Sequence, residues 1–144
     1  MTIDMIDTGA GNDVGYKASV TAKITDKMVR QFAEMSGDFN PIHLDDEFAS
    51  KTRFKKRIAH GMILGALVSR FLNDKIGSGG IYLAQTLKFS NPVYIDDEIT
   101  SHMEITKLHK KRGFGTVETT AVKSTGEVVL KGEATIMMAY GVKD

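Results

Sequence analysis

One apolar segment, IAHGMILGALVSRFLNDKIG at residues 58–77, constrains the fold of this 144-residue chain more than any other. Apolar side chains recur in it at helical spacing and cover most of the circumference of a helix. These residues are Met62, Ile63, Leu64, Ala66, Leu67, Val68, Phe71 and Leu72. A helix that is apolar on nearly all sides is a buried one, so we predict that the rest of the chain surrounds it and that Gly77 ends it.

Residues 81–140 have the alternation of strands that bury one face. Apolar residues alternate with polar ones in 81–89 and 98–106, with Gln85 as a polar exception. The basic stretch 107–115 reads as a loop, and KSTG at 123–126 is a hairpin signal before a long last strand. The pattern predicts an α+β fold in one domain, with an antiparallel sheet curled around the helix and sheet edges that dimerisation can cover.

The N-terminal part reads as a series of short elements. Residues 1–15 carry glycines without apolar periodicity, so we expect a loose lead-in, and 16–25 reads as a short strand. Residues 26–37 have helical spacing and a stop at Gly37. SGDFNPIH at 36–43 is then a loop, and acids favour a short helix starting at Asp45 and Asp46.

The composition excludes several function classes. A net charge of +1 gives no reason to expect nucleic acid, and the absence of Cys removes thiolate chemistry and disulfides. The longest apolar run, GMILGALV, is too short to span a bilayer, and acids and glycines stand where a secretory signal needs an apolar run. Phosphate-binding, dinucleotide and metal-site motifs are absent. We therefore expect a cytoplasmic protein that needs no cofactor and binds no membrane.

Asp38 and His43 are the first candidates for chemistry. A carboxylate and a neutral imidazole can hold one water by accepting its hydrogen bonds, and they can exchange a proton with it. The alternative is that both residues cap turns, which is common for Asp and His in loops. Asn40 lies between them, and its amide can tie the loop together.

AHGM at 59–62 is the second candidate. Gly61 lies where the apolar helix begins, so free backbone N–H groups there can stabilise an oxygen that gains negative charge. Alternatively, Gly61 only allows helix and sheet to approach closely. His60 reads as a hydrogen-bonded structural residue rather than a wall of the site. Ser69 is polar on an otherwise apolar helix, and taken alone it reads as bonded back to its own helix.

Two basic clusters remain. KTRFKKR at 51–57 lies between the two candidate motifs, so it should border any site that they form. It is either a solvated loop or a docking surface for a phosphate-bearing substrate. HKKR at 109–112 reads as an exposed hairpin end.

Taken together, FAEMSGDFNPIHLD at 32–45 and RIAHGM at 57–62 resemble the MaoC-like hydratases and dehydratases, most closely the (R)-specific enoyl-CoA hydratases. The resemblance also covers IYLAQTLKF and the NP after it. It implies a hot dog fold, in which a curled antiparallel sheet wraps one central helix, here 61–73. It also implies a homodimer with sites near the subunit interface.

The reaction that the resemblance implies is reversible addition of water to trans-2-enoyl-CoA, giving (R)-3-hydroxyacyl-CoA. Asp38 and His43 would position and deprotonate the water as catalytic residues. Gly61 would stabilise the enolate oxygen, Ser69 would shape the site, and we place Asn40 with these two in the expected substrate-binding set. Such chemistry needs no cofactor, because the thioester carbonyl already polarises the double bond.

Three alternatives remain open at this point. A 3-hydroxyacyl-ACP dehydratase would use the same residues on a chain bound to acyl carrier protein, and the basic segment 51–57 suits that acidic partner. An acyl-CoA thioesterase shares the fold, although the DFNPIH motif argues against it. A non-catalytic acyl-CoA-binding module is disfavoured because Asp38 and His43 are both present.

Overall fold

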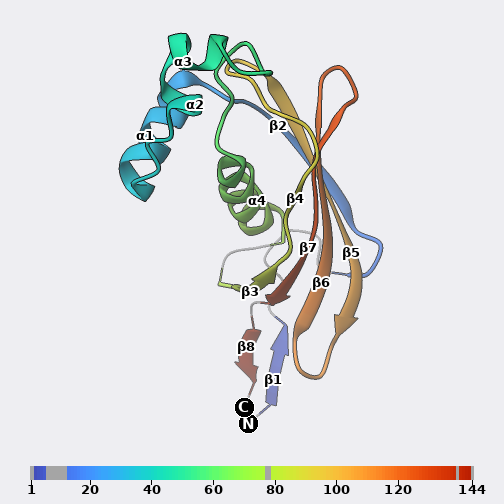
Figure 1. Cartoon of the computed structure of the whole chain (residues 1–144). Coiled ribbons are helices and arrows are strands. Elements are labelled where there is room, and N and C mark those ends of the chain that lie inside the picture. Colours follow the sequence, from blue (N-terminus) through green and yellow to red (C-terminus); the bar gives the residue numbers. More distant parts are fainter. Residues whose placement is uncertain (1, 6–12, 77–78, 139, 144) are drawn as a thin grey trace.

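The computed structural model describes residues 2–5, 13–76, 79–138 and 140–143, with backbone alone for the first and last of these ranges. A curved antiparallel sheet holds one long helix, α4 (Gly61–Ile76), on its concave side (Figure 1). This is the predicted hot dog arrangement. No helix in the described part of the chain is long and apolar enough to cross a lipid bilayer.

Five strands form the main path of this sheet, and every pairing is antiparallel. In spatial order they are β2 (Lys17–Lys23), β5 (Glu98–His109), β6 (Phe114–Lys123), β7 (Val128–Met137) and β3 (Ile81–Gln85). The short strand β4 (Lys88–Phe89) also pairs with β7. The edges are therefore β2 on one side and β3 on the other.

Two strand predictions need correction. The lead-in is not loose throughout, because β1 (Thr2–Met5) pairs with β8 (Tyr140–Lys143) as a separate ribbon, whereas residues 6–12 lie outside the described part. The basic loop is also shorter than predicted. Strands β5 and β6 extend into it and leave an exposed turn at 110–112, which confirms the expected hairpin end.

Helix α4 is buried on one side only, which corrects the expectation that it is enclosed. Its buried residues are Ile63, Leu64, Val68, Phe71, Leu72 and Ile76, all less than a tenth exposed. On the other side Met62 is 52% exposed, and Ala66 and Ser69 are exposed as well. The sheet of one chain wraps only part of the circumference, so an apolar strip of α4 is left without cover. The predicted stop at Gly77 lies outside the described residues.

The polar exception Gln85 lies where β3 separates from β7. Its amide nitrogen donates to the Thr86 carbonyl at 2.8 Å and to the buried Thr119 hydroxyl at 3.1 Å. Its amide oxygen accepts from the Tyr82 hydroxyl. Beside it a Cβ at Gly132 would lie 1.8 Å from the Thr86 oxygen, so only glycine allows this crossing. Gln85 therefore supplies hydrogen bonds at a break in the strand ladder.

Three helices between β2 and α4 form an overhang at one end of the sheet (Figure 1). They are α1 (Asp26–Ser36), α2 (Pro41–Leu44) and α3 (Asp46–Ser50). As predicted, α1 ends at Gly37, whose φ of 78° is left-handed, and Asp45 caps α3. The segment 36–43 is not wholly a loop, because residues 41–43 begin α2.

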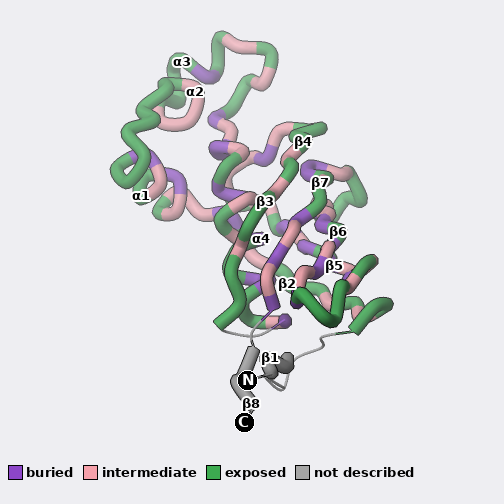
Figure 2. The backbone as a smooth tube through the Cα atoms, turned by 90° about the horizontal axis from the view of Figure 1, so that it is seen from below, coloured by how far each residue is buried: buried purple, intermediate pink, exposed green. Residues whose placement is uncertain are grey.

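The overhang is more exposed than α4 and the central strands β5, β6 and β7, as Figure 2 shows. Val29 and Ala33 of α1 and Ala49 of α3 are its buried apolar residues. With so few buried contacts, its conformation depends strongly on hydrogen bonds to the core.

Candidate active site

Asp38 lies in the bend between α1 and α2, with an exposed side chain. Its backbone N–H donates to the Ser36 hydroxyl at 3.1 Å, and its carboxylate accepts from the Asn40 N–H at 3.2 Å. Asn40 in turn caps α2, because its side-chain oxygen accepts from the Ile42 N–H at 3.2 Å. The expectation that Asn40 ties this segment together is confirmed, and Asp38 also has a turn-forming role.

His43 projects from α2, and its ring is fixed by a hydrogen bond to the segment that leads into α4. Its Nδ1 lies 2.7 Å from the Ile58 carbonyl oxygen. A carbonyl can only accept, so Nδ1 carries the proton and Nε2 of the neutral ring keeps its lone pair. The sequence placed His43 near Asp38 without indicating this bond, which spans fifteen residues.

His60 completes the cluster from the residue just before α4. It is 2% exposed, and its Nε2 donates to the Asp38 carbonyl oxygen at 3.0 Å. Its ring stacks on that of His43 with centroids 3.9 Å apart and 30° between planes. Its centroid lies 4.8 Å from that of the Phe32 ring. The prediction of a hydrogen-bonded His60 is therefore confirmed, and the residue holds both the Asp38 backbone and one face of the His43 ring.

Side-chain ligand atoms of Asp38, His43 and His60 lie within 4.8 Å of one another. This spacing alone would allow a metal ion. However, lone pairs of imidazoles lie in the ring plane, and two rings stacked at 30° do not direct them toward one point. His43 Nδ1 and His60 Nε2 are also engaged with carbonyl oxygens. The acceptors that remain are the Asp38 carboxylate, His43 Nε2 and the buried His60 Nδ1, and they suit a small hydrogen-bonding molecule such as water better.

Gly61 begins α4 and borders the same cavity as His43 and His60, with a volume of about 370 Å³. As the first helical residue, its N–H has no acceptor within the helix. A Cβ at this position would lie 3.0 Å from two atoms of the Phe89 ring. Gly61 therefore also permits a close approach of helix to strand, so the structural explanation for this glycine is supported alongside the proposed donor role.

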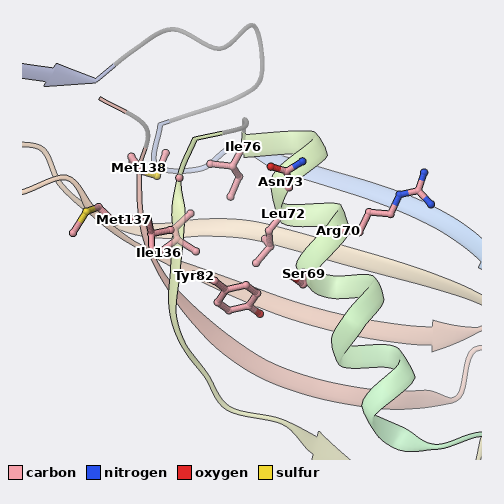
Figure 3. A pocket seen from close by; sticks show the side chains of 11 residues that line it. Ser69, Arg70, Leu72, Asn73, Ile76, Tyr82, Ile136, Met137 and Met138 are labelled. Atoms are coloured by element: carbon pink, nitrogen blue, oxygen red, sulfur yellow. The ribbon is translucent and has the colours of Figure 1, made fainter. Parts of the chain in front are cut away.

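Ser69 does not line the cavity of His43 and Gly61. It borders a second cavity of about 320 Å³ near the other end of α4 (Figure 3). The apolar side chains around it come from α4 and from β3 and β7, including Leu72, Tyr82 and Ile136. Within one chain, Ser69 and Gly61 are separated by eight helical residues, or about 12 Å along the axis.

The basic cluster 51–57 divides into two kinds of residue. Lys51, Arg53, Lys55 and Lys56 are exposed. Arg53 lines the cavity of His43 and Gly61, so the cluster borders the site as predicted. Arg57, by contrast, is 8% exposed and bonded inside the overhang, a role that sequence reasoning missed. Its neighbours in sequence are charged, so nothing in the pattern separates it from them.

Burial lowers the pKa of His43 and outweighs the hydrogen bond to the Ile58 carbonyl and the charge of Asp38, which act in the opposite direction. The neighbouring His60 lowers it further. His43 is consequently neutral at pH 7, with Nε2 available as a proton acceptor. The arrangement can thus hold and deprotonate a water molecule.

The chain matches the family model "MaoC like domain" over residues 9–128. It is 39% identical over 127 residues to an (R)-specific enoyl-CoA hydratase of Aeromonas caviae, covering 88% of this chain and 95% of the relative. The identity to the enzyme of the same name in Rhodospirillum rubrum is 40% over 125 residues, covering 86% of each.

Among solved structures, the unliganded R-hydratase PhaJ1 of Pseudomonas aeruginosa is similar, with a TM-score of 0.86 and 35% identity. That likeness covers 99% of this chain and 94% of the other.

The lowered pKa of His43 predicts a pH-dependent stability. As pH falls below about 6.5, the unfolded chain takes up a proton at His43 that the folded chain resists, so the free energy of unfolding decreases until the folded-state pKa is passed. NMR titration should give His43 a midpoint below 6.5, and His43→Gln should flatten the slope of unfolding free energy in this window. Equal slopes in both proteins would contradict the assignment.

Proposed function

Because the chain belongs to the MaoC-like domain family, we propose that it is a hydro-lyase that adds water reversibly to a trans-2-enoyl-CoA and forms (R)-3-hydroxyacyl-CoA. The observation that carries this proposal is a neutral His43, whose Nε2 keeps its lone pair, in one cluster with the Asp38 carboxylate. Two acceptors of this kind can bind both hydrogens of one water, which leaves its oxygen directed at an electrophilic carbon.

In the proposed hydration, the oxygen of this water bonds to the β-carbon of the enoyl thioester. One water proton passes to His43 Nε2, while Asp38 orients the water. The π electrons move to the thioester oxygen, and the Gly61 N–H stabilises the resulting enolate from the start of α4. The enolate then collapses and takes this proton from the His43 imidazolium at the α-carbon, so that H and OH have been added across the double bond and His43 is neutral again.

His43 suits this role because its other ring nitrogen, Nδ1, already donates a hydrogen bond to the Ile58 carbonyl. Protonation of Nε2 makes the ring cationic, and the Ile58 carbonyl then stabilises it through the Nδ1–H bond of 2.7 Å. Asn40, which we expected near the substrate, caps α2 and contributes by fixing the turn that carries Asp38 and His43.

For the thioester carrier we favour CoA, with Arg53 as a contact for its phosphates. The Arg53 side chain is exposed, lines the cavity of His43, and lies over the Phe54 ring at 4.8 Å, which orients it. A planar guanidinium suits phosphate oxygens. An acidic acyl carrier protein is the alternative partner for the same exposed cluster.

We also propose a homodimer formed through β3 and the uncovered side of α4. Ile81 and Leu83 on the β3 edge are 55% and 46% exposed, and Met62 on α4 is 52% exposed. Apolar residues on an unpaired edge favour association with a second copy. Such a dimer offers a route for Ser69 to join a site of the other subunit, since it lies too far along α4 from Gly61 in its own chain.

The catalytic assignment predicts that Asp38→Asn and His43→Gln each reduce turnover at least about a hundredfold, the usual scale for a general acid or base. Loss of the enoyl absorbance of crotonyl-CoA measures turnover, and chiral analysis should give the (R) product without release of thiol. His102→Gln is the matched control, because this exposed imidazole lies on strand β5, hydrogen-bonds to the Ser19 hydroxyl of β2 at 2.8 Å and should not affect turnover. Near-normal rates in both folded site variants would remove the mechanism.

The phosphate-contact assignment predicts that Arg53→Glu raises KM for crotonyl-CoA about tenfold with little change in kcat, because the charge acts on binding alone. Steady-state kinetics at low ionic strength measures this, with Arg112→Glu at the exposed β5–β6 turn as control. An unchanged KM for the CoA thioester together with weaker turnover of the enoyl-ACP would assign the cluster to carrier-protein docking instead.

The dimer predicts a mass of twice 15.8 kDa at micromolar concentration in light scattering. Leu83→Asp should shift this mass toward the monomer, because a carboxylate would be buried at the β3 edge. Val20→Asp on the opposite edge strand β2, where the side chain is 40% exposed, should leave the mass unchanged. A monomeric mass for the unmodified protein would exclude this dimer.

A further inference from the structure

One cation of the basic segment 51–57 faces inward instead of toward substrate. Arg57 is 8% exposed, and its Nε donates to the carbonyl oxygen of His43 at 2.7 Å. Its Nη2 donates to Asp26 Oδ1 at the first turn of α1. A buried guanidinium with two directed bonds is a structural element with a defined position, unlike the exposed lysines around it.

The bond to His43 satisfies a backbone carbonyl group of α2. The last carbonyl groups of a helix lack partners within it, and in a four-residue helix this applies to almost all of them. The Pro41 oxygen accepts from the Asp45 N–H, and the Ile42 oxygen accepts from the Ile58 N–H at 3.2 Å. Arg57 supplies the donor for the oxygen of His43.

Arg57 and Ile58 consequently hold the backbone and the ring of His43. Arg57 binds its backbone oxygen, while the Ile58 oxygen accepts from its ring nitrogen Nδ1. The segment that follows is itself attached to the core, because the Ala59 N–H donates to the Val93 oxygen at 2.7 Å. Arg57 and Ile58 thus fix the position of His43 relative to the core.

Asp26 anchors the far end of the guanidinium. Hydrogen bonds from Arg57 and Arg30 lower the pKa of Asp26, so the carboxylate is charged at neutral pH. Its other oxygen accepts from Arg30 Nε at 2.9 Å. Arg30 is exposed and pairs with Asp26, which makes it a matched cation that shares this partner with Arg57 without the bond to the His43 carbonyl.

We infer that Arg57 is a positioning residue that sets the placement of His43 for the reaction proposed above, on which this inference rests. Without the Arg57 guanidinium, the His43 carbonyl loses a buried charge-assisted donor, and α2 is free to shift against residue 58. A displacement of about 1 Å at a reacting group costs about a hundredfold in rate. In this role Arg57 makes no contact with substrate.

The kinetic test compares Arg57→Met with Arg30→Met. Arg57→Met should lower kcat for crotonyl-CoA at least about tenfold while KM stays within about twofold, since the substrate contacts are retained. Arg30→Met should keep both parameters. Arg57→Lys retains the charge but offers one nitrogen in place of a planar fork, so we expect an intermediate kcat. Circular dichroism establishes which variants fold, and Arg57→Lys decides the matter if Arg57→Met does not.

A second readout is independent of activity. The long-range ¹H–¹⁵N spectrum of a neutral imidazole identifies which nitrogen is protonated. In the unmodified protein and in Arg30→Met, His43 should be protonated at Nδ1, whereas Arg57→Met should show a shift toward a mixture of the two tautomers. An unchanged His43 spectrum and an unchanged kcat in the folded Arg57 variants would overturn the positioning role. If the unmodified protein hydrates no enoyl thioester, the proposed function fails, and the His43 spectrum alone then decides whether Arg57 positions this ring.

Discussion

The hydrogen bond from His43 Nδ1 to the Ile58 carbonyl is the interaction on which the proposed chemistry depends. It leaves Nε2 as the only acceptor of the ring, in a cluster that also holds Asp38 and His60. The same bond connects the exposed overhang to the segment that enters α4. The Ile58 oxygen thus determines the protonation pattern of the proposed base and, together with Arg57, fixes its place.

Most of the fold followed from hydrophobic periodicity. Strands β5, β6 and β7 and the core of α4 alternate or repeat as their burial requires, so the curled sheet around one helix could be predicted. The exposed side of α4 could not, because periodicity reports apolar character and not which neighbour covers it. Gln85 was visible only as an exception. Its partners Thr86 and Thr119 show that it satisfies a break in the ladder, which depends on tertiary contacts.

For the candidate site, the short spacing of Asp38 and His43 was sufficient to predict that they lie close together. The helical turn at Pro41 was missed because Asp38, Asn40 and Pro41 favour turns as well as helix starts. Arg57 was hidden among four exposed cations, and no local pattern indicates that its partners are Asp26 and the His43 carbonyl. Long-range hydrogen bonds to backbone atoms cannot be predicted from the types of the residues involved.

The overhang is one continuous stretch of chain whose two ends are attached to the same loop of the sheet. The Ile24 N–H donates to the Asp97 oxygen where the stretch begins, and the Ala59 N–H donates to the Val93 oxygen where it ends. An insertion with neighbouring ends can change length and sequence without altering the strand order beneath it. The proposed catalytic pair Asp38 and His43 is therefore carried by a segment separate from the sheet, whereas the proposed donor Gly61 belongs to α4. We expect that the whole stretch can be exchanged between hot dog domains as a unit, provided that both attachment points, Arg57 and the supporting His60 are kept.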